Sequence, residues 1–164
     1  MLNKELEISL HKASMEQLKP KPNEASLGFG QYFTDHMFVM RWNRQAGWHE
    51  AAIQPYQPFS LDPAAMVFHY GQAIFEGMKA YRQGNKAVIF RPMDHLRRLN
   101  NSCRILDIPE VDIDVAHEGL RQLIATEKAW IPKEKGQSLY IRPFMIASEA
   151  FLGKLAGVSD PETK

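Results

Sequence analysis

The fold of this chain is decided by residues 79–106, which read KAYRQGNKAVIFRPMDHLRRLNNSCRIL. Two runs of strand-forming residues, 79–82 and 87–90, flank a short loop that contains glycine and asparagine, a pattern typical of a β-hairpin. Pro92 then stands where a helix readily accepts proline, at its first position. Apolar residues follow at helical spacing, namely Met93, Leu96, Leu99, Cys103 and Leu106. This stretch therefore predicts two antiparallel strands followed by an amphipathic helix.

A second hairpin, an extended segment and a second helix are predicted around this stretch. Residues 32–42 are rich in β-favouring side chains, and residues 43–47 supply turn chemistry before Trp48, which indicates a hairpin. Residues 54–61 contain two prolines and suit an edge strand or an extended connection. Residues 112–128 carry apolar side chains at helical spacing and predict a helix.

The last predicted element is a strand over residues 138–147. Successive side chains of a strand point to opposite faces, so Tyr140 and Arg142 are expected to share one face. Two helices against several antiparallel strands, without regular strand–helix alternation, indicate an α+β fold. We expect a two-layer domain with a mainly antiparallel sheet packed by two helices.

Three segments are expected along the chain. The two prolines within residues 19–22 disfavour both helix and sheet, so residues 1–26 are predicted to form an N-terminal tail. Residues 27–150 are predicted to form the folded domain. Residues 151–164 are small, polar and without periodicity, and they are predicted to begin an interdomain linker.

Composition excludes several classes of function. The 164 residues include 20 basic and 19 acidic side chains, and the net charge of +1 gives no electrostatic footprint for nucleic acid or an anionic membrane. Cys103 is the lone cysteine and no two histidines have metal-ligand spacing, so we expect no disulfide and no metal site. No long apolar run and no secretory or mitochondrial leader pattern is present, so we expect a cytoplasmic protein without a membrane partner.

Four separated blocks of sequence carry a family pattern. They are FG at 29–30 with FTDHM at 33–37, HYGQAIFEGMKAYR at 69–82, FRP at 90–92 with HLRRL at 95–99, and LYIRP at 139–143. In order and spacing these blocks resemble branched-chain amino acid aminotransferases, of the class IV pyridoxal-phosphate-dependent aminotransferase family. The resemblance covers about residues 27–153.

The resemblance implies a fold, an activity and a partner. The fold is the small, N-terminal domain of class IV aminotransferases. The activity is transfer of an amino group between leucine, isoleucine or valine and 2-oxoglutarate, with pyridoxal phosphate as the cofactor. The intact enzyme is expected to be a homodimer of amino acid metabolism, in branched-chain amino acid biosynthesis.

On the cofactor side, Arg98 matches the family arginine that holds the cofactor phosphate. A planar guanidinium suits that task because its donors can pair with two phosphate oxygens at once. The alternative is that Arg98 belongs to a solvated helix face together with Arg97 and Arg104.

On the substrate side, Tyr70 matches a tyrosine whose hydroxyl helps to bind the substrate carboxylate and reaches into the neighbouring subunit's site. The alternative is a half-buried tyrosine whose hydroxyl is satisfied within the fold. Arg142 would orient tyrosine hydroxyls and add positive potential for that carboxylate, or form a structural ion pair instead. Phe29, Phe75 and Tyr140 match the walls of an apolar side-chain pocket. For the two phenylalanines, core packing is the alternative.

No catalytic residue is assigned in this chain. In the family, the lysine that carries the cofactor and the acid beside the cofactor ring lie in the C-terminal domain, and no lysine here stands in a matching context. The chain alone is therefore predicted to be inactive. His69, His95 and Glu76 lie in the matched blocks but receive no chemical role, and Lys154 replaces a small apolar residue of the interdomain loop.

Two alternatives to this function stay open. One is another enzyme of the same class, a D-amino acid transaminase or a 4-amino-4-deoxychorismate lyase. The other is a non-catalytic interaction domain.

Overall fold

The computed structural model describes residues 6–153. The strands are β1 Ser9–Leu10, β2 His36–Asn43, β3 Gly47–Pro55, β4 Ala73–Phe75, β5 Met78–Gln83, β6 Lys86–Ile89, β7 Leu139–Ile141 and β8 Phe144–Ile146. The α-helices are α1 Met66–Tyr70, α2 Pro92–Ile105 and α3 Ile113–Thr126, and the 3-10 turns are η1 Met15–Gln17, η2 Glu24–Ser26 and η3 Lys128–Trp130. Both predicted hairpins and both predicted helices are confirmed, whereas α1 has no counterpart in the sequence prediction.

Within residues 6–153, three small sheets replace the single sheet expected from the sequence. Their strand orders are β1-β3-β2, β4-β8 and β6-β5-β7, and every pair is antiparallel except β1 with β3. The mixed α+β class with antiparallel sheets is confirmed. The predicted strand over 138–147 is divided into β7 and β8 because Pro143 has no backbone N–H to donate to the ladder.

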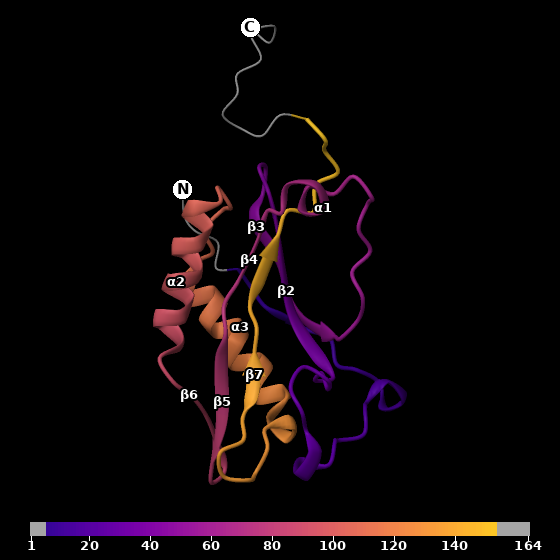
Figure 1. Cartoon of the computed structure of the whole chain (residues 1–164), viewed down its shortest axis with the longest axis vertical. Helices are drawn as coiled ribbons and strands as arrows, with labels where there is room; N and C mark the ends of the chain where they lie inside the picture. The colour runs from indigo at the N-terminus through magenta and orange to yellow at the C-terminus, as the bar shows by residue number, and fades with distance from the viewer. Residues whose placement is uncertain (1–5, 154–164) are drawn as a thin grey trace, which may run out of the picture.

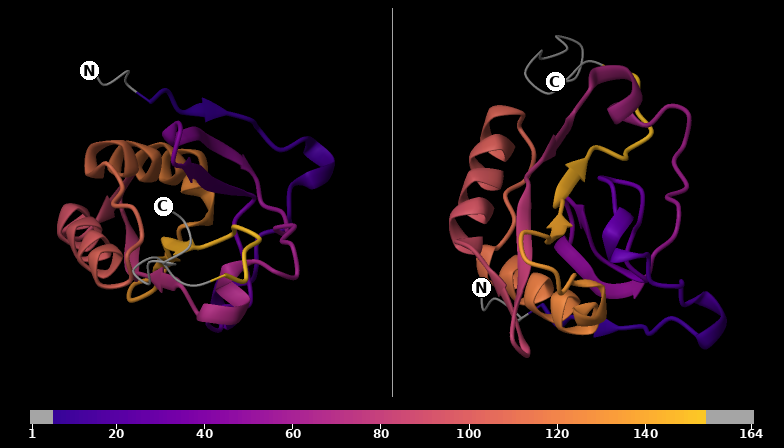
Figure 2. Two further views of the ribbon diagram at one scale, coloured as in Figure 1. Left: turned by 90° about the horizontal axis from the view of Figure 1, so that it is seen from above. Right: turned by 60° about the horizontal axis from the view of Figure 1, so that its bottom comes forward.

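The two main helices lie side by side and cover the sheets from one side (Figures 1 and 2). The Asp112 carboxylate caps α3 by accepting from the backbone N–H groups of Asp114 and Val115. The long connection between β3 and α1 runs along the side opposite α2. The main core lies between the helices and β5; its buried members are Met78, Ala80, Leu96, Val111, Ala116, Leu120, Ile124 and Ile131.

Residues 6–26 are bound along the body of the domain. β1 pairs in parallel with β3, with Ser9 opposite Ala52 and Leu10 opposite Ile53. Further along, the backbone N–H of Lys19 donates to the Asp35 carboxylate at 2.9 Å. The prolines do keep residues 19–22 out of helix and sheet, but side-chain hydrogen bonds fix a segment that was expected to be a tail. Lys154 and the rest of the expected linker, 154–164, lie outside the described residues.

The buried face of α2 anchors this helix, and its loss should be costly. Leu99 is 2% exposed, whereas Ile105 near the end of the same helix is 80% exposed. We expect Leu99→Ala to lower the free energy of unfolding by about 2–5 kcal/mol, because it leaves a cavity in the core. Ile105→Ala should change it by less than about 0.5 kcal/mol. Urea denaturation followed by circular dichroism measures both, and equal effects would contradict the packing of α2.

Candidate functional site

Four of the sequence-predicted residues meet on one side of the β4–β5 and β7–β8 strands. The guanidinium carbon of Arg142 lies 4.5 Å from the ring centroid of Phe75 and 5.4 Å from that of Tyr140. The Phe29 ring meets the Tyr140 ring edge to face, with centroids 5.2 Å apart. We call Phe29, Phe75, Tyr140 and Arg142 the aromatic cluster. A cation held between aromatic faces in this way is both oriented and partly shielded from water.

Strand geometry explains how residues far apart in sequence reach this cluster. Tyr140 and Arg142 are two positions apart, and the Arg142 Nη2 lies 3.5 Å from the Tyr140 hydroxyl, which confirms that they share a face. Phe75 ends β4 opposite Phe144. A Cβ atom on Gly77 would collide with the Tyr140 hydroxyl, so the absence of a side chain at this position makes room for that ring.

The aromatic cluster is open on one side. Phe29 and Phe75 are 71% and 60% exposed, so neither is packed in the core, which was the alternative for both residues. Phe29, Tyr140 and Arg142 line a broad cleft that continues toward Phe59 and Phe144. Large apolar surface of this kind is typical of a place where a ligand or another protein segment binds.

Tyr70 lies apart from the aromatic cluster, at the end of α1. Its hydroxyl donates to the Gly153 carbonyl at 3.1 Å. Gly71 ends the helix in the left-handed conformation, with φ of 62°, which a residue with a side chain adopts only at a cost. The fold therefore brings Phe29, Phe75, Tyr140 and Arg142 together within this chain but gives Tyr70 a different position.

Arg98 on α2 is bound by a buried carboxylate from the strand break, which is the interruption between β4 and β5. Its Nε donates to Glu76 Oε1 at 2.5 Å and its Nη2 donates to Glu76 Oε2 at 2.6 Å. Glu76 is 6% exposed and lies between β4 and β5. The hydrogen bonds from Arg98 lower the pKa of Glu76 despite its burial, and Glu76 in turn raises the pKa of Arg98. The bidentate pair fixes the orientation of the guanidinium.

This pairing separates Arg98 from the neighbouring arginines. Arg97 bonds to Asp94 within the same helix, and Arg104 bonds to Glu110 in the following loop. Those two are ordinary surface pairs, whereas Arg98 is tied to a buried group on a different element.

Glu76 and His95, which were assigned no chemical role from the sequence, are the partners of Arg98. His95 Nδ1 lies 3.3 Å from Glu76 Oε2 and 3.5 Å from Arg98 Nη2. Two signals in the sequence could have revealed this arrangement. Glu76 follows Phe75, so strand alternation sends it away from the aromatic cluster, and His95 and Arg98 are three apart on one helix face.

The donors of Arg98 fit the phosphate end of pyridoxal phosphate. A guanidinium has five N–H groups, and Glu76 accepts from only two of them. The Arg98 side chain is 64% exposed, so the other donors can reach an anion. The described residues contain no group of three or more histidine, cysteine, aspartate or glutamate side chains placed to share a metal ion.

The Glu76–Arg98 pair should make the stability of the chain depend on pH. Because the folded state lowers the pKa of Glu76 below its usual 4.5, its contribution is fully present above pH 4.5 and is lost as the pH falls through the lowered value. We expect Glu76→Gln to cost about 1–3 kcal/mol at pH 7 and less at pH 3.

Chemical denaturation at both pH values measures this difference. A matched control is Glu50→Gln, because Glu50 pairs with Arg41 where both side chains are exposed and should matter little. A difference between wild type and Glu76→Gln that stays constant from pH 7 to pH 3 would contradict the assignment.

Each helix in the described part of the chain is too short or too polar to cross a bilayer.

A comparison with protein-family models finds no match. The chain is 54% identical over 142 residues to branched-chain-amino-acid transaminase 1 of Bacillus subtilis (strain 168), a match that covers 86% of this chain and 40% of that protein. It is 52% identical over 138 residues to a probable branched-chain-amino-acid aminotransferase of Staphylococcus epidermidis, covering 84% and 38%. The chain thus spans about 40% of the length of these curated relatives.

Solved structures agree with the sequence matches. The branched-chain amino acid aminotransferase from Escherichia coli superposes with a TM-score of 0.52 at 27% identity, covering 66% of this chain and 35% of that chain. A branched-chain amino acid aminotransferase of T.th., complexed with N-(5'-phosphopyridoxyl)-L-glutamate, gives a TM-score of 0.52 at 27% identity, covering 62% and 32%. In sequence and in fold, this chain therefore matches the N-terminal part of branched-chain aminotransferases.

Proposed function

We propose that this chain forms the N-terminal part of an enzyme that transfers the amino group between leucine, isoleucine or valine and 2-oxoglutarate. The aromatic cluster around Arg142 is the observation that carries the proposal. It joins an apolar surface, which suits a branched side chain, to a cation, which suits the carboxylate of an amino acid.

The two parts of the cluster have different tasks. Phe29, Phe75 and Tyr140 bind the branched side chain and exclude water from it, at about 0.8 kcal/mol for each CH₂ group buried. Arg142 adds positive potential for the carboxylate and orients the Tyr140 hydroxyl. As the family resemblance implies, the Tyr70 hydroxyl exchanges its bond to the Gly153 carbonyl for one to the substrate carboxylate in a neighbouring subunit, so the intact enzyme is a homodimer.

Arg98 holds the phosphate of pyridoxal phosphate on the other side of the strand break. When bound, this cofactor supplies the ring that withdraws electrons from the reacting carbon. Glu76 holds the guanidinium of Arg98 in place, and the N–H groups that Glu76 leaves free bind the phosphate. The cofactor lysine and the ring acid belong to the remaining part of the protein, so the catalytic residues are outside this chain.

The nearest alternatives are less well supported. A D-amino acid transaminase or a 4-amino-4-deoxychorismate lyase would share the helix block around Arg98. The 54% and 52% identical relatives both carry branched-chain aminotransferase names. A non-catalytic interaction domain would have no need for a bidentate pair that fixes an exposed arginine. We assign the enzyme to the cytoplasm and to branched-chain amino acid biosynthesis.

Substitution of Arg98 should separate cofactor binding from substrate choice. The experiment uses a complete enzyme in which this chain replaces the matching 142-residue segment of the Bacillus subtilis transaminase 1. We expect Arg98→Ala to weaken pyridoxal phosphate binding by about ten- to a hundred-fold, the effect of losing a charge-assisted hydrogen bond. The relative kcat/KM values for leucine, isoleucine and valine should not change, because the aromatic cluster is untouched.

Arg97→Ala is the matched control, since Arg97 bonds only to Asp94 on the same helix surface in the described structure. It should retain the cofactor like the unsubstituted enzyme. Unchanged cofactor retention in Arg98→Ala together with a new substrate order would show that Arg98 is misassigned.

The chain by itself should have no transaminase activity. Cofactor bound only through a phosphate contact has no lysine to hold its reacting carbon. Incubation with pyridoxal phosphate, leucine and 2-oxoglutarate, followed by a glutamate assay, tests this expectation, with the complete chimeric enzyme as the positive control. Sustained turnover by the isolated chain would overturn the assignment of the catalytic residues to the rest of the protein.

A further inference from the structure

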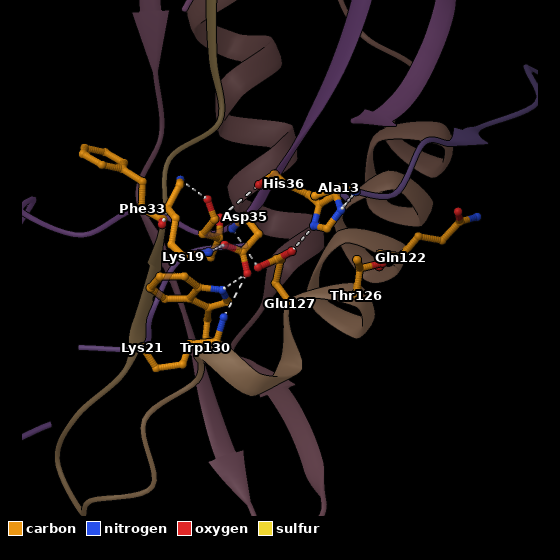
Figure 3. Close-up of polar contacts among 11 residues, drawn as sticks. Ala13, Lys19, Lys21, Phe33, Asp35, His36, Gln122, Thr126, Glu127 and Trp130 are labelled. Atoms are coloured by element: carbon orange, nitrogen blue, oxygen red, sulfur yellow. Dashed lines mark hydrogen bonds and ion pairs between the residues drawn. The ribbon is translucent and has the colours of Figure 1, made fainter. Parts of the chain in front are cut away.

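A loop of the N-terminal region, residues 19–35, is closed at its base by the Asp35 carboxylate (Figure 3). Asp35 Oδ1 accepts from the backbone N–H of Lys19 at 2.9 Å. Asp35 Oδ2 accepts from Lys21 Nζ at 2.9 Å and from Trp130 Nε1 at 2.8 Å. One buried carboxylate therefore joins both ends of the 19–35 loop to η3.

The two lysines close the loop further. Lys19 Nζ donates to the carbonyls of Phe33 and Thr34 at 3.3 and 2.8 Å, and it lies 4.4 Å from the ring centroid of Tyr56. Lys21 Nζ lies 3.9 Å from the centroid of the Trp130 ring. Each ammonium group thus has both a polar and an aromatic partner, which favours a single position. We call Asp35, Lys19 and Lys21 the clasp.

Glu127 holds Asp35, the central residue of the clasp, in place. Its carboxylate accepts from the backbone N–H of Asp35 at 3.1 Å and pairs with His36 Nδ1. His36 Nε2 accepts from the backbone N–H of Ala13 at 2.8 Å, so the proton of the neutral ring is on Nδ1 and is donated to Glu127. Burial opposes ionisation of Asp35, but the hydrogen bonds from Lys19, Lys21 and Trp130 outweigh it and lower its pKa.

Phe29 lies on this loop, and its own side chain makes few contacts that would hold it in place. Gly28 and Gly30 on either side of it have φ values of +63° and +70°, so the chain turns twice around Phe29. The Phe29 side chain is 71% exposed, yet its ring meets Tyr140 at 5.2 Å. The far side of the loop is attached to the segment before β7, because Gln137 Nε2 donates to the Glu24 carbonyl at 2.7 Å.

We propose that the clasp is a positioning device for the substrate pocket: Asp35, Lys19 and Lys21 hold the 19–35 loop closed so that Phe29 stays against Tyr140. This inference rests on the proposed function, in which Phe29 is a wall of the side-chain pocket. None of the three clasp residues touches the substrate. They act on substrate recognition through Phe29 and leave the phosphate site around Arg98 unaffected.

The first experiment measures the loop in this chain without substrate. The double variant Lys19→Met/Lys21→Met keeps the aliphatic stems but removes both ammonium groups, and Lys12→Met/Lys86→Met is the control at two exposed lysines elsewhere. We expect amide hydrogen exchange in residues 20–34 to become about ten- to a hundred-fold faster in the clasp variant, and the Phe29–Tyr140 ring contact to vanish from NMR spectra. Exchange like that of the control would overturn the proposal.

The second experiment measures substrate recognition in the complete chimeric enzyme. We expect the clasp variant to raise the KM values for leucine, isoleucine and valine by about tenfold, with kcat and cofactor retention unchanged. Simple loss of folded enzyme would lower kcat instead. Lys21→Arg should keep KM near that of the unsubstituted enzyme, because a guanidinium can still donate to Asp35, whereas Lys21→Met should not.

Phe29→Ala distinguishes failure of this inference from failure of the proposed function. If Phe29→Ala leaves all three KM values unchanged, the pocket assignment is wrong and the inference falls with it. If Phe29→Ala raises KM but an opened clasp does not, the pocket stands and the clasp has no part in it. Parallel increases in KM for both variants support the proposal.

Discussion

The candidate functional site depends on one backbone hydrogen bond, at the point where two neighbouring strands are both interrupted. The backbone N–H of Glu76 donates to the Pro143 carbonyl at 2.9 Å, at the point where β4 gives way to β5 and β7 gives way to β8. This bond keeps the two interrupted strands together although the regular ladder stops. Because the break preserves the alternation of side chains, Phe75 and Arg142 emerge on one side, and Glu76 emerges on the other, toward α2.

The two sides of this break are electrostatically different. On one side, Arg142 is held by aromatic rings without a carboxylate among its described contacts, so its charge is available to an anionic substrate group. On the other side, Glu76 neutralises the charge of Arg98. This pair therefore provides an anion with N–H groups of fixed orientation rather than with net positive charge. A bidentate guanidinium whose orientation is already fixed loses less conformational entropy when an anion binds, which offsets some of the attraction that the carboxylate removes.

Residue patterns predict the local elements well and the long-range contacts poorly. The hairpins and the helices at Pro92 and Asp112 follow from turn residues and helical spacing, which are local properties. The Glu76–Arg98 pair joins residues 22 positions apart, and the bond from Trp130 to Asp35 joins residues 95 apart. Such contacts arise from packing rather than from spacing. The aromatic cluster was predictable only because a family pattern had already singled out its members.

The smallest strand has a consequence for association between chains. A strand at the border of a sheet presents unpaired backbone groups that can recruit a strand from another molecule. Without β1, the nine-residue strand β3 would be such a border, with its second side open. The two residues of β1 occupy the middle of that side at Ala52 and Ile53, and the His11 N–H extends the cover to the Ile53 carbonyl at 2.8 Å. Ser9 and Leu10 thus protect the domain against edge-to-edge aggregation, and cleavage after them would expose a template for it.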